Sequence, residues 1–227
     1  MTRGVFVTGT DTGVGKTLVC CALLHALAAR GVRAAPMKPI AAGAIEHAGR
    51  WVNEDTLRLL EAAGRDASFA DLTTPILLRE PIAPHIAAAR EGRSMALQPV
   101  AEALAQLALS GNFLVVEGVG GLRVPLDDRT DTVDLARAIG LPIVLVVGLR
   151  LGCLNHALLT AEAIEAARLR LAGWIANSID PHMAVADENV AALQSRLRAP
   201  LLGRMPFMAR PDARALAANL EVGPLLA

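Results

Sequence analysis

The two lysines of this chain, Lys16 and Lys38, are the residues whose type points most directly to chemistry. Lysines and arginines together number 22, so every other member of this group is an arginine. Lysine carries a compact charge on a flexible stem, whereas arginine presents a planar fork, and the two do not replace each other where chemistry depends on that shape. We therefore expect a chemical requirement for an ammonium group at both positions.

Lys16 lies in residues 9–17, whose sequence is GTDTGVGKT, between an apolar run and a helical pattern. Glycines let several backbone N–H groups of such a loop face one anion, and the following helix adds unpaired donors and its positive end. Lys16 would then reach the β- and γ-phosphates of a nucleotide, and the hydroxyl of Thr17 would ligate Mg²⁺. The strict Walker A pattern has glycine where this chain has Thr10, so the loop is a variant of it. We predict nucleotide binding.

The composition is typical of a globular domain. Its 227 residues have a formal net charge of zero and are 53% hydrophobic, so we expect one domain, residues 1–227, that binds neither nucleic acid nor membrane. The longest strongly apolar run, residues 139–149, is too short to span a bilayer. The cysteines and histidines have neither a disulfide framework nor metal-ligand spacing, which indicates a reduced, cytoplasmic setting.

Apolar runs alternate with helical patterns along the chain. This order predicts an α/β protein with a single-domain P-loop NTPase fold, in which helices cover both faces of a mostly parallel central sheet. The expected strands are residues 4–8, 33–38, 113–117, 143–148, 172–177 and 201–205. The expected helices are residues 16–29, 54–63, 100–109, 133–139, 156–169 and 184–197. Residues 41–99 form a long excursion between two strands, and excursions of this length usually carry function.

The ends of the expected strands carry a chemically coherent set of side chains. Ligands of open parallel sheets bind at the carboxyl ends of the strands. Lys38, Glu117 and Asn177 each end an expected strand, the phosphate loop follows the first strand, and residues 152–155 follow the fourth. Glu117 closes the run FLVVE, which resembles a Walker B strand whose acid holds Mg²⁺, although a solvated carboxylate is the alternative.

The order of these motifs resembles that of the dethiobiotin synthetases, ATP-dependent carboxylases that close the ureido ring in biotin biosynthesis. The resemblance covers nearly the whole chain. It rests on residues 7–12 (VTGTDT) and 15–17 (GKT), 38–41 (KPIA), 53–55 (NED), 80–81 (EP), 84–85 (PH), 116–121 (VEGVGG), 151–157 (LGCLNHA), 172–177 (AGWIAN) and 200–203 (PLLG). Related septum-positioning and chromosome-partitioning ATPases have an extra lysine where this chain has Asp11, which argues against their nucleotide-driven dimerisation.

The resemblance implies that ATP, CO₂ and 7,8-diaminononanoate react in one active site, with Mg²⁺ as the cofactor. CO₂ carbamylates the diamine, and a carbamate oxygen then attacks the γ-phosphorus of ATP to give a carbamic-phosphoric anhydride. The second amine closes the cyclic urea and expels phosphate, with ADP as the other product. In the family, the segment equivalent to residues 152–155 reaches the substrate of the partner subunit, which implies a homodimer with active sites at the subunit interface.

The resemblance also assigns roles to individual residues. Lys16 and Lys38 would stabilise the transferring phosphoryl group and the carbamate, with Thr12 as a further catalytic contact. The expected Mg²⁺ ligands are Thr17, Asp55 and Glu117. Asp55 has an alternative role as an acid that stabilises a helix N-terminus. The expected nucleotide-binding residues are Asp11, Thr12, Gly13, Val14, Gly15, Lys16, Thr17, Leu18, Glu117, Asn177, Pro206 and Phe207. The expected substrate-binding residues are Lys38, Ala42, Gly152, Cys153, Leu154 and Asn155.

Two of these assignments leave alternatives open. Residues 152–155 precede a helix expected to begin near His156, with Asn155 as its N-cap, and the free N–H groups there suit a carboxylate as well as they suit simple capping. The amide of Asn177 can pair with the adenine edge. Residues 177–180 (NSID) also have the Asn and Asp spacing of a guanine-reading motif without its lysine, so some use of GTP stays open.

Ala42 departs from the family pattern, which commonly has serine at this position. Because Ala42 lacks the hydroxyl contact that serine would make, we expect an active enzyme with a modestly raised KM for its substrate. Two other functions stay open on the sequence, namely another P-loop ligase acting on a different carboxylate and a nucleotide-dependent switch ATPase. A measurement of whether phosphate release depends on a small diamine would distinguish these two functions from the synthetase.

Overall fold

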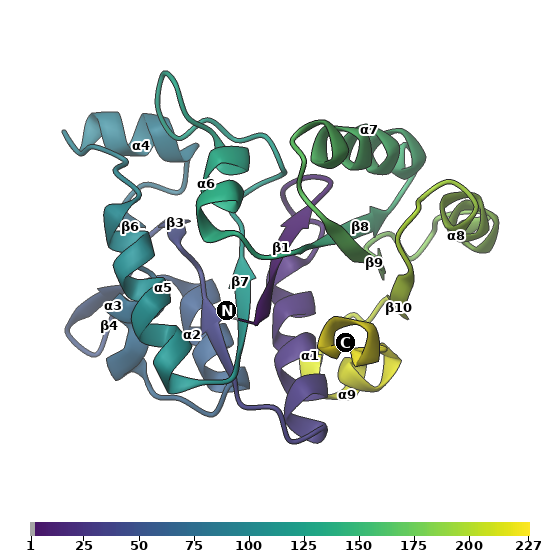
Figure 1. The fold of residues 1–227 in the computed structure, drawn as a ribbon, viewed down its shortest axis with the longest axis horizontal. Helices are drawn as coiled ribbons and strands as arrows, with labels where there is room; N and C mark the ends of the chain where they lie inside the picture. The colour runs from purple at the N-terminus through teal and green to yellow at the C-terminus, as the bar shows by residue number, and fades with distance from the viewer. Residues whose placement is uncertain (1–2) are drawn as a thin grey trace.

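A computed structural model describes residues 3–227. Six strands form a parallel sheet in the order β10-β9-β8-β1-β7-β2 (Figure 1). They are β1 (Gly4–Gly9), β2 (Ala34–Met37), β7 (Phe113–Glu117), β8 (Ile143–Leu149), β9 (Leu171–Ser178) and β10 (Leu201–Met205). The predicted α/β fold is confirmed, and all the expected strands belong to this sheet.

Most of the helices pack on the two faces of the sheet, while α4 (Pro84–Arg90) packs against the small pair of strands described below. The following helices are present among the described residues. They are α1 (Lys16–Ala29), α2 (Glu54–Ala62), α3 (Ala70–Thr73), α4 (Pro84–Arg90), α5 (Gln98–Ser110), α6 (Thr132–Ile139), α7 (Cys153–Ala166), α8 (Ala186–Gln194), α9 (Ala213–Leu216) and α10 (Gly223–Leu226). Helices α1, α2 and α9 lie on one face, and α5 to α8 lie on the other. In the part of the chain that the structure describes, no helix is long and apolar enough to cross a membrane.

β1 illustrates why the central strands appear in the sequence as nearly continuous runs of apolar residues. Side chains alternate between the two faces of a strand. Val5 and Val7 pack into the core beneath α1, while Phe6 packs into the core beneath α5 and α6. Because both faces are covered, apolar residues alternate toward both faces, and every residue of β1, including Thr8, is buried.

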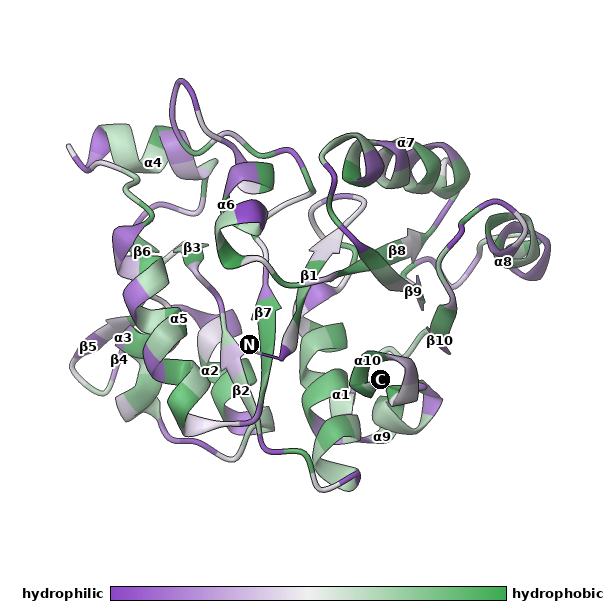
Figure 2. Ribbon diagram, viewed as in Figure 1, coloured by the Kyte–Doolittle hydropathy of each residue, from purple (hydrophilic) through white to green (hydrophobic). Residues whose placement is uncertain are grey.

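α1 carries the phosphate loop at its N-terminus, and its observed bounds match the predicted ones. It is buried around much of its circumference because it packs on β1 and β7 and also against α2 and α9. Figure 2 shows the consequence, since α1 is hydrophobic over most of its length whereas α7 and α8 alternate hydrophobic and hydrophilic residues. The tight packing of α1 fixes the loop that precedes it.

The long excursion from residue 41 to residue 99 has its own small structures. β3 (Ile40–Ala42) pairs in parallel with β6 (Ile76–Leu78), and β4 (Ile45–His47) forms a hairpin with β5 (Arg50–Val52). Asn53 then caps α2: its side-chain oxygen accepts from the N–H of Asp55, and its amide donates to the carbonyls of Ala42 and Gly43. One capping residue therefore holds two predicted site residues, Ala42 and Asp55, near each other.

α7 begins earlier than predicted, at Cys153 instead of His156, so the prediction that Asn155 is its N-cap is wrong. The N-cap is Gly152, whose φ of 93° lies in the left-handed region that glycine adopts without strain. The N–H of Cys153 donates to the carbonyl of Arg150 at 3.0 Å. Backbone geometry thus starts the helix without a capping side chain, and Asn155 lies inside the first turn.

Candidate active site

A cleft of about 850 Å³ opens where the carboxyl ends of the sheet strands meet the phosphate loop. Its volume falls within the range of roughly 300–1,000 Å³ typical of small-molecule sites. The predicted site residues that line it are Thr12, Gly13, Gly15, Lys16, Thr17, Leu18, Lys38, Ala42, Asp55, Glu117, Asn177, Pro206 and Phe207. Asp11 and Val14 belong to the phosphate loop but do not line the cleft, and neither do residues 152–155.

The phosphate loop depends on Gly15, which has a φ of 86° and serves as the N-cap of α1 without a side-chain cap. A Cβ atom at Gly15 would lie 2.2 Å from Nδ2 of Asn177 and would also be strained by the positive φ. Only glycine therefore lets this loop pass beneath the end of β9. The first N–H groups of α1 stay available for an anion, as in other phosphate-binding helix termini.

Lys16 is buried at the mouth of this loop, and its Nζ donates to the carbonyl oxygen of Asp11 at 3.0 Å. Burial lowers the pKa of Lys16, and the carboxylate of Glu117 partly opposes this change. A buried ammonium group with a single carbonyl partner has two further N–H donors. These donors and its charge suit the oxygens of a phosphate chain.

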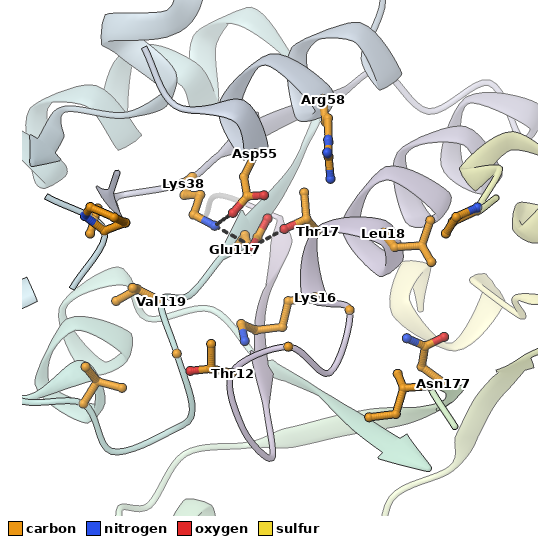
Figure 3. A pocket seen from close by; sticks show the side chains of 18 of the residues that line it. Thr12, Lys16, Thr17, Leu18, Lys38, Asp55, Arg58, Glu117, Val119 and Asn177 are labelled. Atoms are coloured by element: carbon orange, nitrogen blue, oxygen red, sulfur yellow. Dashed lines mark hydrogen bonds and ion pairs between the residues drawn. The ribbon is translucent and has the colours of Figure 1, made fainter. Parts of the chain in front are cut away.

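Lys38, Asp55, Glu117 and Thr17 form one polar network beside the phosphate loop (Figure 3). Nζ of Lys38 lies 2.7 Å from Oε1 of Glu117 and also donates to Oδ2 of Asp55. The hydroxyl of Thr17 donates to the same Oε1 of Glu117 at 2.8 Å. The four side chains come from α1, α2, the end of β7 and the residue that follows β2, so the fold brings together residues that are up to 100 positions apart.

The charges of this network stabilise one another. Burial alone would lower the pKa of Lys38, but Glu117 and Asp55 outweigh it and raise the pKa above its ordinary value. Burial alone would raise the pKa of Asp55, but the ammonium of Lys38 outweighs it and lowers that pKa. Lys38 is therefore cationic and Asp55 anionic at neutral pH, and the single ammonium group balances part of the charge of two carboxylates.

The oxygen donors in this network fit Mg²⁺. Oε2 of Glu117 is buried without a hydrogen-bond partner among residues 3–227, and a buried carboxylate oxygen of this kind is costly unless a cation pairs with it. Across the same residues no group of three or more His, Cys, Asp and Glu side chains is suited to a metal. Two carboxylates and the hydroxyl of Thr17 would therefore need phosphate or water oxygens to complete an octahedral Mg²⁺ site.

The far end of the cleft is suited to a nucleotide base. Asn177 is buried, and one N–H of its amide donates to the carbonyl of Val14 at 2.8 Å. The second N–H and the amide oxygen remain for a base edge. Pro206 and Phe207 line this end, as predicted, and Phe207 is 44% exposed. Met208, which follows them, also lines the cleft, and the prediction did not include three further apolar lining residues, which are Ile179, Pro211 and Leu216.

The opposite end of the cleft is apolar and was missing from the predicted site. It is lined by Pro81, Ile82, Pro84, Val119 and Val124, beside Ala42. An alkyl chain would be desolvated there. The prolines belong to the excursion of residues 41–99, in which only Ala42 and Asp55 were predicted as site residues. Arg58 was also missed, although it lies on α2 one turn after Asp55, a spacing that places both on the same helix face.

Comparisons with known proteins agree with this geometry. Residues 3–214 match the model of an AAA domain family. The chain is 55% identical to the ATP-dependent dethiobiotin synthetase of Ralstonia nicotianae over 98% of this chain and 96% of that protein. It is 53% identical to the enzyme of the same name from Aromatoleum aromaticum, over 97% of each chain.

Solved structures extend the likeness in fold. The septum site-determining protein MinD of Pyrococcus horikoshii, complexed with Mg-ADP, has a TM-score of 0.57 at 18% identity, covering 99% of this chain and 89% of that one. At such low identity this likeness shows the fold alone. The dethiobiotin synthetases, in contrast, match more than half of the residues along nearly the whole chain, and this chain therefore belongs to the ATP-dependent dethiobiotin synthetase family.

Proposed function

We propose that the cleft performs the complete dethiobiotin synthetase reaction, in which 7,8-diaminononanoate, CO₂ and ATP give dethiobiotin, ADP and phosphate. The observation that carries this proposal is the position of Lys38. Its ammonium group lies between the phosphate loop and the apolar end of the cleft, beside the carboxylates of Asp55 and Glu117. The residues on either side of it therefore suit a phosphate chain and an alkyl diamine respectively.

The reaction begins when one amine of the substrate takes up CO₂ as a carbamate. A carbamate oxygen attacks the γ-phosphorus of ATP, the bond to ADP breaks, and a carbamic-phosphoric anhydride results. Lys16 and Lys38 would stabilise the negative charge on the transferring phosphoryl group and hold the carbamate in line with it. Removing one such contact typically costs about 3–4 kcal/mol of transition-state stabilisation.

Thr17, Asp55 and Glu117 would hold Mg²⁺, which when bound neutralises phosphate charge and orients the nucleotide. The ammonium group of Lys38 pairs with one oxygen of each of these two carboxylates. With the metal charge present, the carboxylates would need Lys38 less, and its ammonium group would be free to contact substrate oxygens. Thr12, which faces the cleft near Lys16, would add a hydroxyl contact (Figure 3).

Ring closure follows when the second amine attacks the carbonyl carbon of the anhydride and expels phosphate. The apolar end of the cleft, from Pro81 to Pro84 with Val119 and Val124, would hold the alkyl chain and exclude water from the anhydride. Water must be excluded because it competes with the second amine for the anhydride. Attack by water would hydrolyse the anhydride, whereas attack by the amine closes the ring.

The carboxylate of the substrate needs a second anion site. We propose the turn of residues 152–155, whose backbone N–H groups begin α7. Cys153 is buried and its N–H donates to the carbonyl of Arg150, so the N–H groups of Leu154 and Asn155 would bind the carboxylate. Because this turn does not line the cleft of the same chain, it would serve the cleft of a partner subunit in a cytoplasmic homodimer. The exposure of Leu151 at 96% supports a contact surface there.

Phosphate release tests the proposed function. We expect release from Mg·ATP and bicarbonate only when 7,8-diaminononanoate is present, and mass spectrometry should then find a cyclic urea. Diamine-independent phosphate release would point to a switch ATPase. Release that depends on another carboxylate, with no reaction of the diamine, would point to a different ligase.

Restoring a hydroxyl at Ala42 should improve substrate binding. Ala42 lines the cleft at the end of β3. A new hydrogen bond is worth about 0.5–1.5 kcal/mol, so Ala42→Ser should lower the KM for the diamine several-fold with little change in kcat. Steady-state kinetics with varied diamine measures this effect. Ala44→Ser is the control, because Ala44 does not line the cleft. An unchanged KM in Ala42→Ser would show that another group already makes this contact.

A further inference from the structure

Asp11 fixes the phosphate loop through three of its oxygen atoms. Its Oδ1 accepts from the N–H of Thr12 at 2.7 Å, and its backbone carbonyl accepts from Nζ of Lys16 at 3.0 Å. The third oxygen, Oδ2, accepts from Nη2 of Arg150 at 2.5 Å. Arg150 lies 139 positions further along the chain, so Asp11 joins the nucleotide loop to a distant segment.

Arg150 fixes the other end of this connection. It directly follows β8, and its carbonyl accepts from the N–H of Cys153 at 3.0 Å, which closes the turn that begins α7. Gly152 lies inside this turn in the left-handed conformation. The turn is the segment proposed above to bind the substrate carboxylate. The side chain of one residue therefore contacts the nucleotide loop, while its backbone shapes the carboxylate turn.

Folding stability alone does not explain this ion pair. The side chains of Arg150 and Asp11 are 41% and 46% exposed, and ion pairs that face water to this extent contribute little to stability. The N–H of Thr12 lowers the pKa of Asp11, Arg150 adds to this effect, and slight burial opposes it. Asp11 is therefore charged at neutral pH. A carboxylate this close to a triphosphate site would repel the nucleotide if no cation balanced it, and Arg150 supplies that cation.

We propose that the Asp11–Arg150 ion pair is a positioning device that couples nucleotide binding in one subunit to binding of the substrate carboxylate at the turn of the same subunit, which serves the cleft of its partner. This inference rests on the proposed function, because it takes the diamine as the ligand of the turn. A carboxylate that holds the turn also holds Arg150, and Arg150 holds Asp11 with the Thr12 and Lys16 contacts that shape the phosphate loop. Each ligand then strengthens binding of the other by the same factor, as linkage requires.

The test measures this factor by isothermal titration calorimetry in the assembled enzyme. The Kd of a non-hydrolysable ATP analogue with Mg²⁺ is determined with and without 7,8-diaminononanoate, for the wild type, Arg150→Gln and Arg150→Lys. We expect the diamine to tighten analogue binding about fivefold or more in the wild type, within the usual range of such couplings. Arg150→Gln should reduce the factor to less than about twofold while leaving Tm within about 2 °C, because an exposed ion pair contributes little to stability. Arg150→Lys should retain most of the coupling.

Arg198→Gln is the matched control. Arg198 forms an exposed ion pair with Glu165 of α7 at 3.1 Å and contacts neither the phosphate loop nor the turn. Arg198→Gln should keep the wild-type coupling factor, which is the tightening of ATP-analogue binding by the diamine, and the wild-type KM values. In steady-state kinetics, Arg150→Gln should raise the KM for both ATP and the diamine several-fold and change kcat less.

Three results would overturn the inference. Retention of the wild-type factor in Arg150→Gln, or an equal loss in Arg198→Gln, would show that this ion pair does not carry the coupling. A wild-type enzyme that forms the cyclic urea but shows no mutual strengthening would remove the coupling and leave the proposed function standing. A wild-type enzyme that neither binds nor converts the diamine would remove both.

Discussion

Replacing Lys38 with alanine is expected to lower kcat by about 10²- to 10³-fold, the usual effect of losing one preorganised contact to the transition state. The same change should destabilise the metal-free protein. Glu117 and Asp55 would lose their shared ammonium group, and Glu117 is only 1% exposed. Removing one partner of a buried ion pair typically costs about 3–5 kcal/mol. We expect the lower end of that range, because the side chain of Asp55 is 34% exposed.

The two effects of Lys38→Ala separate in the presence of Mg²⁺ and ADP. A loss of about 3 kcal/mol corresponds to a fall in Tm of roughly 6–12 °C for a chain of this size. A metal bound by Glu117 and Asp55 would replace the missing positive charge, so Mg·ADP should restore most of the Tm but none of the turnover. Differential scanning calorimetry and phosphate release measure the two quantities.

Lys38→Arg is the control for charge. Arginine keeps the positive charge but replaces the compact ammonium group with a planar fork, so we expect it to recover stability and to leave kcat well below the wild type. Turnover of Lys38→Ala near the wild-type rate would contradict a catalytic role for this side chain. A full Tm in the metal-free variant would contradict the electrostatic role of the ion pair.

Replacing Glu117 with glutamine should weaken Mg²⁺ binding strongly. Glu117 accepts hydrogen bonds from Thr17 and Lys38 through Oε1, while Oε2 stays buried and unpaired among the described residues. An amide is a much weaker ligand for a hard divalent cation than a carboxylate. We expect the Mg²⁺ concentration for half-maximal activity to rise at least about tenfold and kcat to fall by about 10²-fold, comparable to the loss of one transition-state contact.

Titration of activity with Mg²⁺ at saturating ATP measures the effect of Glu117→Gln, and calorimetric titration of Mg²⁺ with ADP measures metal binding without turnover. Glu102→Gln is the control, because Glu102 is exposed on α5, where it accepts a hydrogen bond from Gln98. An unchanged Mg²⁺ dependence in Glu117→Gln would show that the metal does not use this carboxylate. A chelator should abolish turnover of the wild type.

The elements that the sequence predicted best are those with local signals. The phosphate loop and α1 combine glycines, a lysine and a helical apolar pattern within one short stretch, and the observed helix has the predicted bounds. The central strands are buried on both faces, so their apolar runs stand out. The side chains at the strand ends were predicted to converge because the geometry of a parallel sheet requires it, and Lys38, Glu117 and Asn177 all line the cleft.

The features that escaped prediction depend on contacts between distant residues. The N-terminus of α7 is set by the left-handed Gly152 and the carbonyl of Arg150, and not by the nearby Asn155 that resembled a cap. β3 and β6 are three residues long and pair across more than thirty positions, so neither gives a periodic signal. The Asp11–Arg150 pair likewise has no local signature, because its partners are 139 positions apart.

Transfer of oxygen from bicarbonate to phosphate tests the proposed chemistry most directly. If a carbamate oxygen attacks the γ-phosphorus and leaves with it after ring closure, a single turnover with ¹⁸O-bicarbonate in unlabelled water should yield phosphate with one ¹⁸O atom together with the cyclic urea. Omission of 7,8-diaminononanoate should leave the phosphate unlabelled and its release negligible. Formation of the cyclic urea with unlabelled phosphate would contradict the carbamic-phosphoric anhydride, and phosphate release without the diamine would contradict the synthetase reaction in this cleft.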